Sequence, residues 1–140
     1  MIDTVVLATD GSDSVARAVT VGVDLAQRFD ATMHALFVID DRVIGSAPSD
    51  LRTEFDDALV DRGNRAVDRV KTESSSDIVA SIRRGQPPIE ITRYAKNEEA
   101  DLVVMGTRGR HGTNRFVIGS VAETVVRTCP IPVLTVRQLD

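Results

Sequence analysis

The chain has little cysteine, little lysine and no long apolar run. One of its 140 residues is cysteine, Cys129, so the chain cannot form an internal disulfide or a cysteine-based metal finger. No apolar run approaches the roughly 20 residues that a helix needs to span a bilayer. The N-terminus carries an acid at position 3 and reads as a strand, which excludes a signal peptide. We therefore expect a protein of the reducing cytoplasm that enters no membrane.

Charge excludes two further classes of partner. The formal net charge is −4, which argues against general binding to nucleic acid or to a membrane surface. The acids are mostly Asp (15 of 21) and the bases almost all Arg (15 of 17). Any cationic cluster must therefore be local, and one segment has it, with Arg108, Arg110, His111 and Arg115 close together.

What is present is an alternation of short β-branched runs and longer amphipathic segments. The strand patterns fall at 4–9, 32–40, 77–85, 101–106 and 129–137. Helical patterns follow the first four, at about 12–29, at 51–73, from 87 onward and at 119–128. Such alternation predicts an α/β fold, a doubly wound five-stranded parallel sheet with helices on both faces. The length predicts one domain over residues 1–140.

The helical periodicity also predicts which side chains face the sheet. For the first helix these are Val15, Ala18, Val19, Gly22, Leu25, Ala26 and Phe29, with Ser12 or Asp13 as its cap. For the second they are Leu51, Phe55, Leu59, Ala66 and Val70. The pattern of residues 41–50 predicts a polar loop. This loop could form a lid over a bound base or a surface for a partner protein, and both alternatives stay open.

Two unusual loops follow the first and fourth strands. They are "TDGSD" and "GTRGRHGTNRFVIGS". Ligands of doubly wound sheets bind at the carboxyl ends of the strands, where the strand order reverses. If these two strands are neighbours, their loops face one another across one crevice.

The second loop has the composition of a phosphate-binding segment. Gly106, Gly109 and Gly119 let the main chain come close to a ligand and let successive N–H groups point into one concavity. Ser120 adds a hydroxyl at the start of a helix, where the helix dipole favours an anion. The loop is neither a Walker A motif nor the G-x-G-x-x-G of dinucleotide sites. Its spacing is G-x2-G-x9-G-S.

This spacing, followed by a short helix and "CPIPVLTVR", resembles the universal stress protein family in its ATP-binding subgroup. "VVLATDGSDSVARAV" and "GQPPIEITRYAKNEEADLVVMGTRGR" are similar to the same family, and the resemblance covers nearly the whole chain. It implies strand order 3-2-1-4-5, a bound ATP and a homodimer formed through the last strand, Pro132 to Val136.

The resemblance also implies roles for single residues. Asp10 matches the acid that contacts the nucleoside, and Val38 and Met105 match apolar positions beside the base. The groups around ribose and phosphates would come from Gly106, Gly109, Gly119, Ser120 and Val121. On its own position, Asp10 is equally well explained as a turn residue that caps the first helix.

We expect a nucleotide-dependent switch or sensor with no catalytic residue. No acidic pair is placed to hold Mg²⁺ against a γ-phosphate, although the ion could accompany the nucleotide. His111 has no partner constellation and is expected to be a solvated loop residue. A slow ATPase or a protein that phosphorylates itself at Ser120 is the alternative, and a dimerising scaffold without ligand is a third.

Overall fold

The computed structural model describes residues 1–108 and 118–139. Five parallel strands form one sheet in the order β3-β2-β1-β4-β5, which confirms the predicted α/β fold and strand order. The strands are β1 (Thr4–Ala8), β2 (Thr32–Asp40), β3 (Ile78–Gly85), β4 (Leu102–Gly106) and β5 (Val133–Val136). The helices are α1 (Ala16–Arg28), α2 (Asp41–Gly45), α3 (Arg52–Glu73), α4 (Pro87–Asn97) and α5 (Ser120–Thr128), with short 3₁₀ turns η1 (Asp13–Val15) and η2 (Ser49–Leu51).

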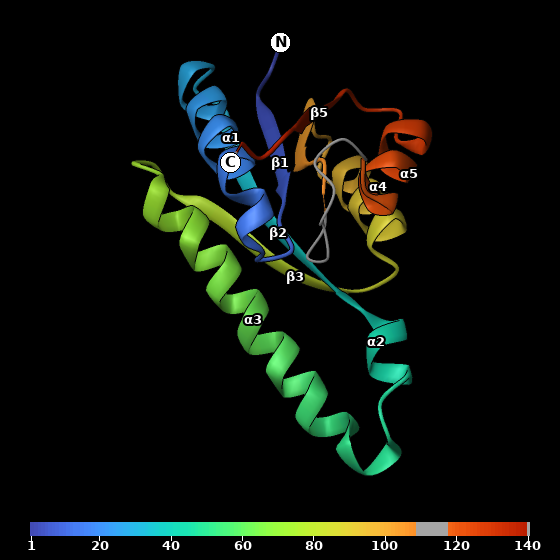
Figure 1. The fold of residues 1–140 in the computed structure, drawn as a ribbon. Helices are drawn as coiled ribbons and strands as arrows, with labels where there is room; N and C mark the ends of the chain where they lie inside the picture. Colours follow the sequence, from blue (N-terminus) through green and yellow to red (C-terminus); the bar gives the residue numbers. More distant parts are fainter. Residues whose placement is uncertain (109–117, 140) are drawn as a thin grey trace.

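Helices cover both faces of the sheet. α1 and α3 lie on one face, and α4 and α5 lie on the other (Figure 1). Side chains alternate between the two faces along each strand. Along β2, for example, Met33, Ala35 and Phe37 pack under α1 and α3, whereas Leu36 packs under α4 and α5. β1 and β4 are buried on both faces, which explains their unbroken apolar sequences.

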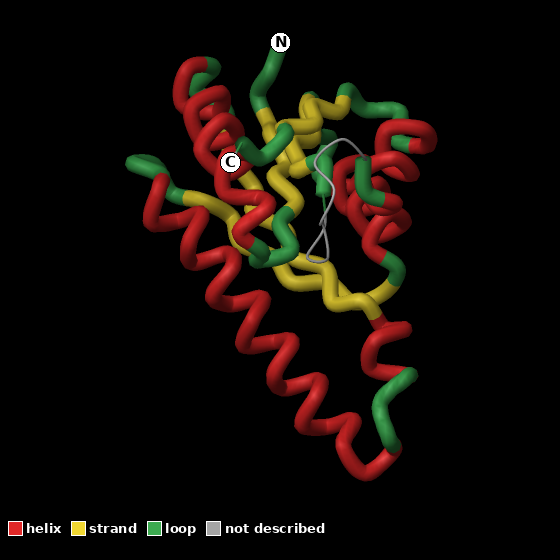
Figure 2. Tube along the Cα trace, viewed as in Figure 1, coloured by secondary structure: helices red, strands yellow, loops and turns green. Residues whose placement is uncertain are grey.

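The predicted inner face of α3 is wrong at its first turns. Leu51 and Phe55 are 38% and 42% exposed, whereas Gly63, Ala66 and Val70 are buried as the periodicity requires. Figure 2 shows the reason: the helix begins well beyond the edge of the sheet and crosses it only with its second half. The apolar stripe is thus longer than the surface that can cover it.

Two further expectations need correction. The segment 41–50 contains helix α2 and is not an open loop, because the Asp40 side chain caps it by accepting from the Arg42 N–H at 3.0 Å. α2 packs against α3 and β3. Phe29 follows the last residue of α1 and is 48% exposed, so the inner face of α1 ends at Ala26.

A small polar network is buried between the sheet and α4. The Tyr94 hydroxyl lies 2.7 Å from His34 Nδ1 and 2.9 Å from Ser81 Oγ. The Arg83 guanidinium lies over the Tyr94 ring at 5.2 Å from its centroid. Burial lowers the pKa of His34, and the nearby Glu98 carboxylate offsets part of this effect. His34 is therefore neutral at pH 7, and its Nδ1 shares a hydrogen bond with the Tyr94 hydroxyl.

Gly63 provides a test of the packing between α3 and β2. A Cβ at this position would lie 2.8 Å from Phe37 Cδ1 and 3.2 Å from Ile82 Cδ1. Gly63→Ala gains about 1 kcal/mol of helix propensity but overpacks the core, which costs about 1–3 kcal/mol. We expect the free energy of unfolding in urea to fall by about 1 kcal/mol. Gly45→Ala, where nothing lies within 4 Å, is the control and should lose nothing. A Gly63→Ala protein as stable as the parent would contradict this packing.

His34 predicts a pH dependence of stability. Because its pKa is lower in the folded chain than in the unfolded chain, the unfolded state binds more protons once the pH drops below about 6.5. The free energy of unfolding should therefore fall between pH 6.5 and the lower folded-state pKa. Urea unfolding at pH 7.5 and 5.5 measures this loss. The loss should shrink in His34→Gln and persist in His111→Gln; equal losses in both variants would assign it to other groups.

Candidate functional site

The turn after β1 is built around Asp10. Its Oδ1 accepts from the Ser12 N–H at 2.9 Å and from the Ser12 hydroxyl at 2.6 Å, which closes an Asx turn. Gly11, inside the turn, has φ +75°, a conformation that favours glycine. Thr9 Oγ1 accepts from the Gly11 N–H at 3.1 Å. Asp10 is thus held at the carboxyl end of β1 with its carboxylate half-buried.

The predicted cap of the first helix is wrong. Neither Ser12 nor Asp13 caps through its side chain, and the turn passes through η1 before α1 begins at Ala16. The physical reason is the Asx turn itself, because the Ser12 hydroxyl donates to Asp10 and does not accept a backbone N–H.

Helix α3 reaches the same turn, which the sequence did not reveal. Arg62 Nε donates to the Asp10 carbonyl oxygen at 3.2 Å. A Cβ on Gly11 would lie 3.3 Å from Ala66 Cβ, so the turn rests directly on the helix. Arg62 is separated from Asp10 by 52 residues, and nothing in the local pattern of α3 distinguishes it from the other arginines.

The end of β4 lies beside this turn. β1 and β4 are neighbours, as expected, with Val5, Val6 and Leu7 opposite Leu102, Val103 and Val104. Gly106 is buried, and a Cβ there would lie 3.4 Å from the Ser14 carbonyl oxygen in η1. The end of β4 and η1 are therefore in contact, although a Cβ at position 106 would make only ordinary van der Waals contacts.

The two ends of the glycine-rich segment are joined. The Gly119 N–H donates to the Thr107 carbonyl oxygen at 2.5 Å, and the Thr107 N–H donates to Val136 O of β5 at 3.3 Å. Gly109, the remaining glycine of the motif, lies outside the described residues. The chain thus leaves the sheet after Gly106 and returns to the same place at the start of α5.

α5 begins beside this junction with Ser120 and Val121. Gly119 is its N-cap, in an extended conformation, and no side chain caps the helix. Ser120 is exposed and Val121 is half-buried. The first N–H groups of a helix lack partners within the helix and attract anions. The junction therefore has the character of an anion-binding site.

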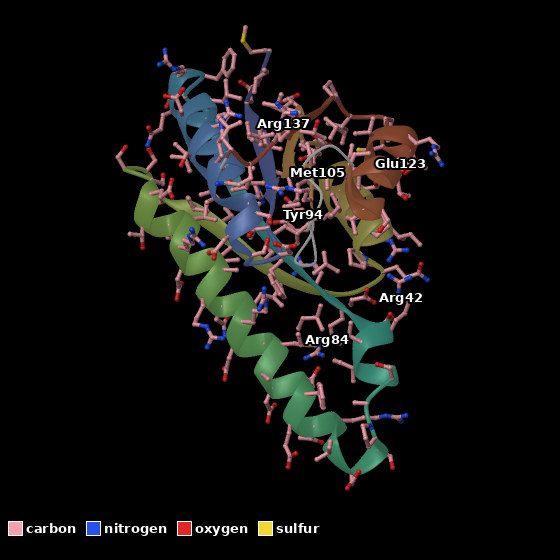
Figure 3. All side chains as sticks on the ribbon, viewed as in Figure 1. Arg42, Arg84, Tyr94, Met105, Glu123 and Arg137 are labelled. Carbon is pink, nitrogen blue, oxygen red and sulfur yellow. The ribbon has the colours of Figure 1, made fainter. Side chains whose placement is uncertain are left out.

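The predicted apolar contacts lie on one face of the sheet. Met105, labelled in Figure 3, is 5% exposed and Val38 is half-buried, and both pack on the side covered by α4 and α5. Ala8 of β1 packs in the same cluster. Val38 lies two residues beyond Leu36, the last residue of β2 that pairs with β1, where it is opposite Ala8.

Arg108 has an unsatisfied buried donor. Its Nε is buried and has no hydrogen-bond partner within the described chain, while one terminal nitrogen donates to the Gln138 carbonyl oxygen at 3.4 Å. A buried guanidinium nitrogen without a partner is costly unless a ligand or water supplies the acceptor. This donor next to the glycine-rich segment fits an anionic group.

Other features of the described residues do not define a site. In 1–108 and 118–139, no three His, Cys, Asp or Glu side chains are grouped to hold a metal ion. None of the helices in those two ranges is long and apolar enough to cross a membrane. A surface pocket of about 420 Å³ lies between α4 and α5, and none of the predicted site residues lines it.

Fold and site together define an α/β protein in which the turn after β1, the end of β4 and the start of α5 meet at the carboxyl edge of a parallel sheet. The model of the universal stress protein family matches residues 1–137, and the chain belongs to that family.

Three similar proteins illustrate the match. Universal stress protein MJ0531 of Methanocaldococcus jannaschii is 35% identical over 138 residues, which is 96% of this chain and 81% of that protein. The structure of hypothetical protein MJ0577 is 25% identical with a TM-score of 0.82, over 100% of this chain and 99% of the other. A universal stress protein in complex with cAMP is 27% identical with a TM-score of 0.72, over 97% of both chains.

Proposed function

We propose that this protein binds ATP at the carboxyl edge of β1 and β4 and acts as a nucleotide-dependent switch or sensor in a stress response. The observation that carries the proposal is the bond between Thr107 and Gly119, which joins the two described ends of the glycine-rich segment at the N-terminus of α5. The phosphates would bind the N–H groups of Gly119, Ser120 and Val121, together with the Ser120 hydroxyl. Gly109 keeps its predicted role in the same segment.

The nucleoside would lie between the two loops. Asp10 offers a carboxylate in the turn after β1, and Ser12 occupies one of its oxygens, Oδ1. Its Oδ2 atom is the acceptor that we assign to the ribose hydroxyls. Val38 and Met105 would border the base with apolar surface.

One observation favours an adenine nucleotide, and a second favours a phosphate group. One relative of the same fold was solved in complex with cAMP, which contains the same base and sugar. The buried Nε of Arg108 requires an acceptor, and a phosphate oxygen would satisfy it. Mg²⁺ would be carried by the phosphates, because the described residues form no acidic cluster for it.

We also propose that the protein is a cytoplasmic homodimer formed through Pro132 to Val136. β5 is the edge strand of the sheet, and within residues 1–108 and 118–139 it pairs with β4 alone, so its outer backbone groups are offered to a second copy. Val133 and Leu134 are half-buried in the single chain and would be covered further. Sedimentation at micromolar concentration should give the mass of two chains, and a single-chain mass would refute this part.

Asp10→Asn tests the nucleotide site directly. The amide oxygen of Asn still accepts from Ser12, so the turn is kept while the charge is lost. A charged hydrogen bond is stronger than a neutral one, and we expect the Kd for ATP in calorimetry to rise about tenfold, which is about 1.4 kcal/mol. Asp13→Asn is the control, because that side chain is fully exposed one turn away. Equal affinity in Asp10→Asn and the parent would place the nucleoside elsewhere.

A slow ATPase or self-phosphorylation at Ser120 is the second candidate, favoured by the exposed Ser120 hydroxyl at the start of α5. We expect neither reaction to be fast, because no described carboxylate cluster holds a metal for in-line attack. Incubation with labelled ATP should give a turnover below about 1 s⁻¹ and no phosphoprotein by mass spectrometry. Faster release of ADP would make the protein an enzyme. Label that disappears in Ser120→Ala would favour phosphoryl transfer.

A further inference from the structure

We infer that Gln138 is a positioning residue that joins the two loops of the nucleotide site. It lies in the segment that follows β5, which runs from the end of the sheet to α1 (Figure 1). Gln138 is half-buried. The inference rests on the proposed function, because positioning has a purpose only if a ligand binds between the loops.

The first contact of Gln138 caps α1. Its Oε1 accepts from the Arg17 N–H at 2.9 Å. Arg17 is the second residue of α1, so this N–H is one of the donors that have no partner inside the helix. No neighbouring side chain caps the helix, since Ser12 is engaged with Asp10 and Val15 has no acceptor. Gln138 thus supplies from 121 residues away the acceptor that a local cap usually provides.

Arg17 makes a second hydrogen bond to the same segment. Its guanidinium donates to the Arg137 carbonyl oxygen at 3.0 Å. Figure 3 labels Arg137 between α1 and β5. The start of α1 and the segment 137–138 therefore hold each other by one backbone donor and one side-chain donor.

The same segment holds the start of the glycine-rich loop. The Thr107 N–H donates to Val136 O at 3.3 Å, and Arg108 donates to the Gln138 carbonyl oxygen at 3.4 Å. Thr107 in turn accepts from Gly119 at the start of α5. Three consecutive residues, 136 to 138, thus contact both the helix behind the Asp10 turn and the base of the phosphate-binding segment.

The consequence concerns the distance between the two loops. The Asp10 turn leads directly into η1 and α1, and Gly106 packs against Ser14 of η1. A ligand that spans Asp10 and Ser120 needs these segments at a fixed separation. Gln138 contacts Arg17 at the start of α1 and Arg108 at the start of the glycine-rich segment, and it does not contact the expected position of the ligand. We therefore assign it a positioning role.

Calorimetry with ATP in variants of the full chain tests the inference. Gln138→Ala removes the acceptor for Arg17, and we expect the Kd to rise five- to tenfold. Gln138→Glu keeps an oxygen at this place, and a carboxylate suits a helix N-terminus, so affinity should return to within twofold of the parent. Gln27→Ala is the matched control, because Gln27 is an exposed glutamine bonded to Ser75 at the other end of α1. Equal affinity in Gln138→Ala and the parent overturns the inference while the proposed function stands.

Amide hydrogen exchange without nucleotide gives a second readout. In Gln138→Ala, exchange should accelerate about tenfold at Arg17 and also at Thr107 and Gly119, and Gln138→Glu should restore all three. Acceleration at Arg17 alone would make Gln138 a helix cap and overturn the positioning role. If the parent chain binds no nucleotide, the proposed function fails, and the exchange at Thr107 and Gly119 still decides whether Gln138 joins the two loops.

Discussion

The parallel pairing of β1 with β4 is the contact on which the site depends. It brings together two strands separated by almost a hundred residues. Asp101 stabilises the pairing at the amino edge of the sheet, because its Oδ2 accepts from the N–H groups of Asp3 and Thr4 at 2.8 and 3.0 Å. These two bonds lower the pKa of Asp101, so the carboxylate stays charged in weak acid. At the opposite edge, the same pairing places the Asp10 turn beside Gly106. The Asp10 turn and the end of β4 are thus brought together by the strand pairing and not by a local feature of either segment.

Much of this arrangement could be predicted from the sequence, because strands buried on both faces and helices with one apolar stripe leave periodic patterns. The strand order followed from the family resemblance, and the pairing confirms it. The exposure of Leu51 and Phe55 could not be predicted in the same way, since a periodic stripe does not state where the sheet beneath it ends. Helix α2 was missed because its cap, Asp40, is the last residue of a strand.

Within the candidate site, the residues that were missed share one property. Arg62 contacts a turn 52 residues away and Gln138 contacts the start of helix α1, 121 residues away, and each does so through a backbone group of its partner. Backbone groups are the same in every residue, so the partner's sequence holds no sign of the contact. The turn at Asp10 was accessible from the sequence because an aspartate directly after a buried strand has a chemical reason of its own, whereas the predicted contacts of Asp10 and Gly106 with a nucleotide stay predictions.

The start of α5 and the Asp10 turn would bind different parts of the nucleotide, and this difference bears on which nucleotides the proposed site selects. Under the proposed function, main-chain N–H groups at the start of α5 would recognise phosphate charge without counting phosphates, so they would not separate ATP from other adenine nucleotides. Asp10 differs, because a carboxylate that accepts from ribose hydroxyls requires those hydroxyls to be free. In a 3′,5′-cyclic nucleotide the 3′ oxygen is esterified and cannot donate, whereas the 2′ hydroxyl still can. Under the proposed function, Asp10 would therefore accept one hydrogen bond fewer from a cyclic nucleotide than from an open one, at the β1 turn that Arg62 contacts.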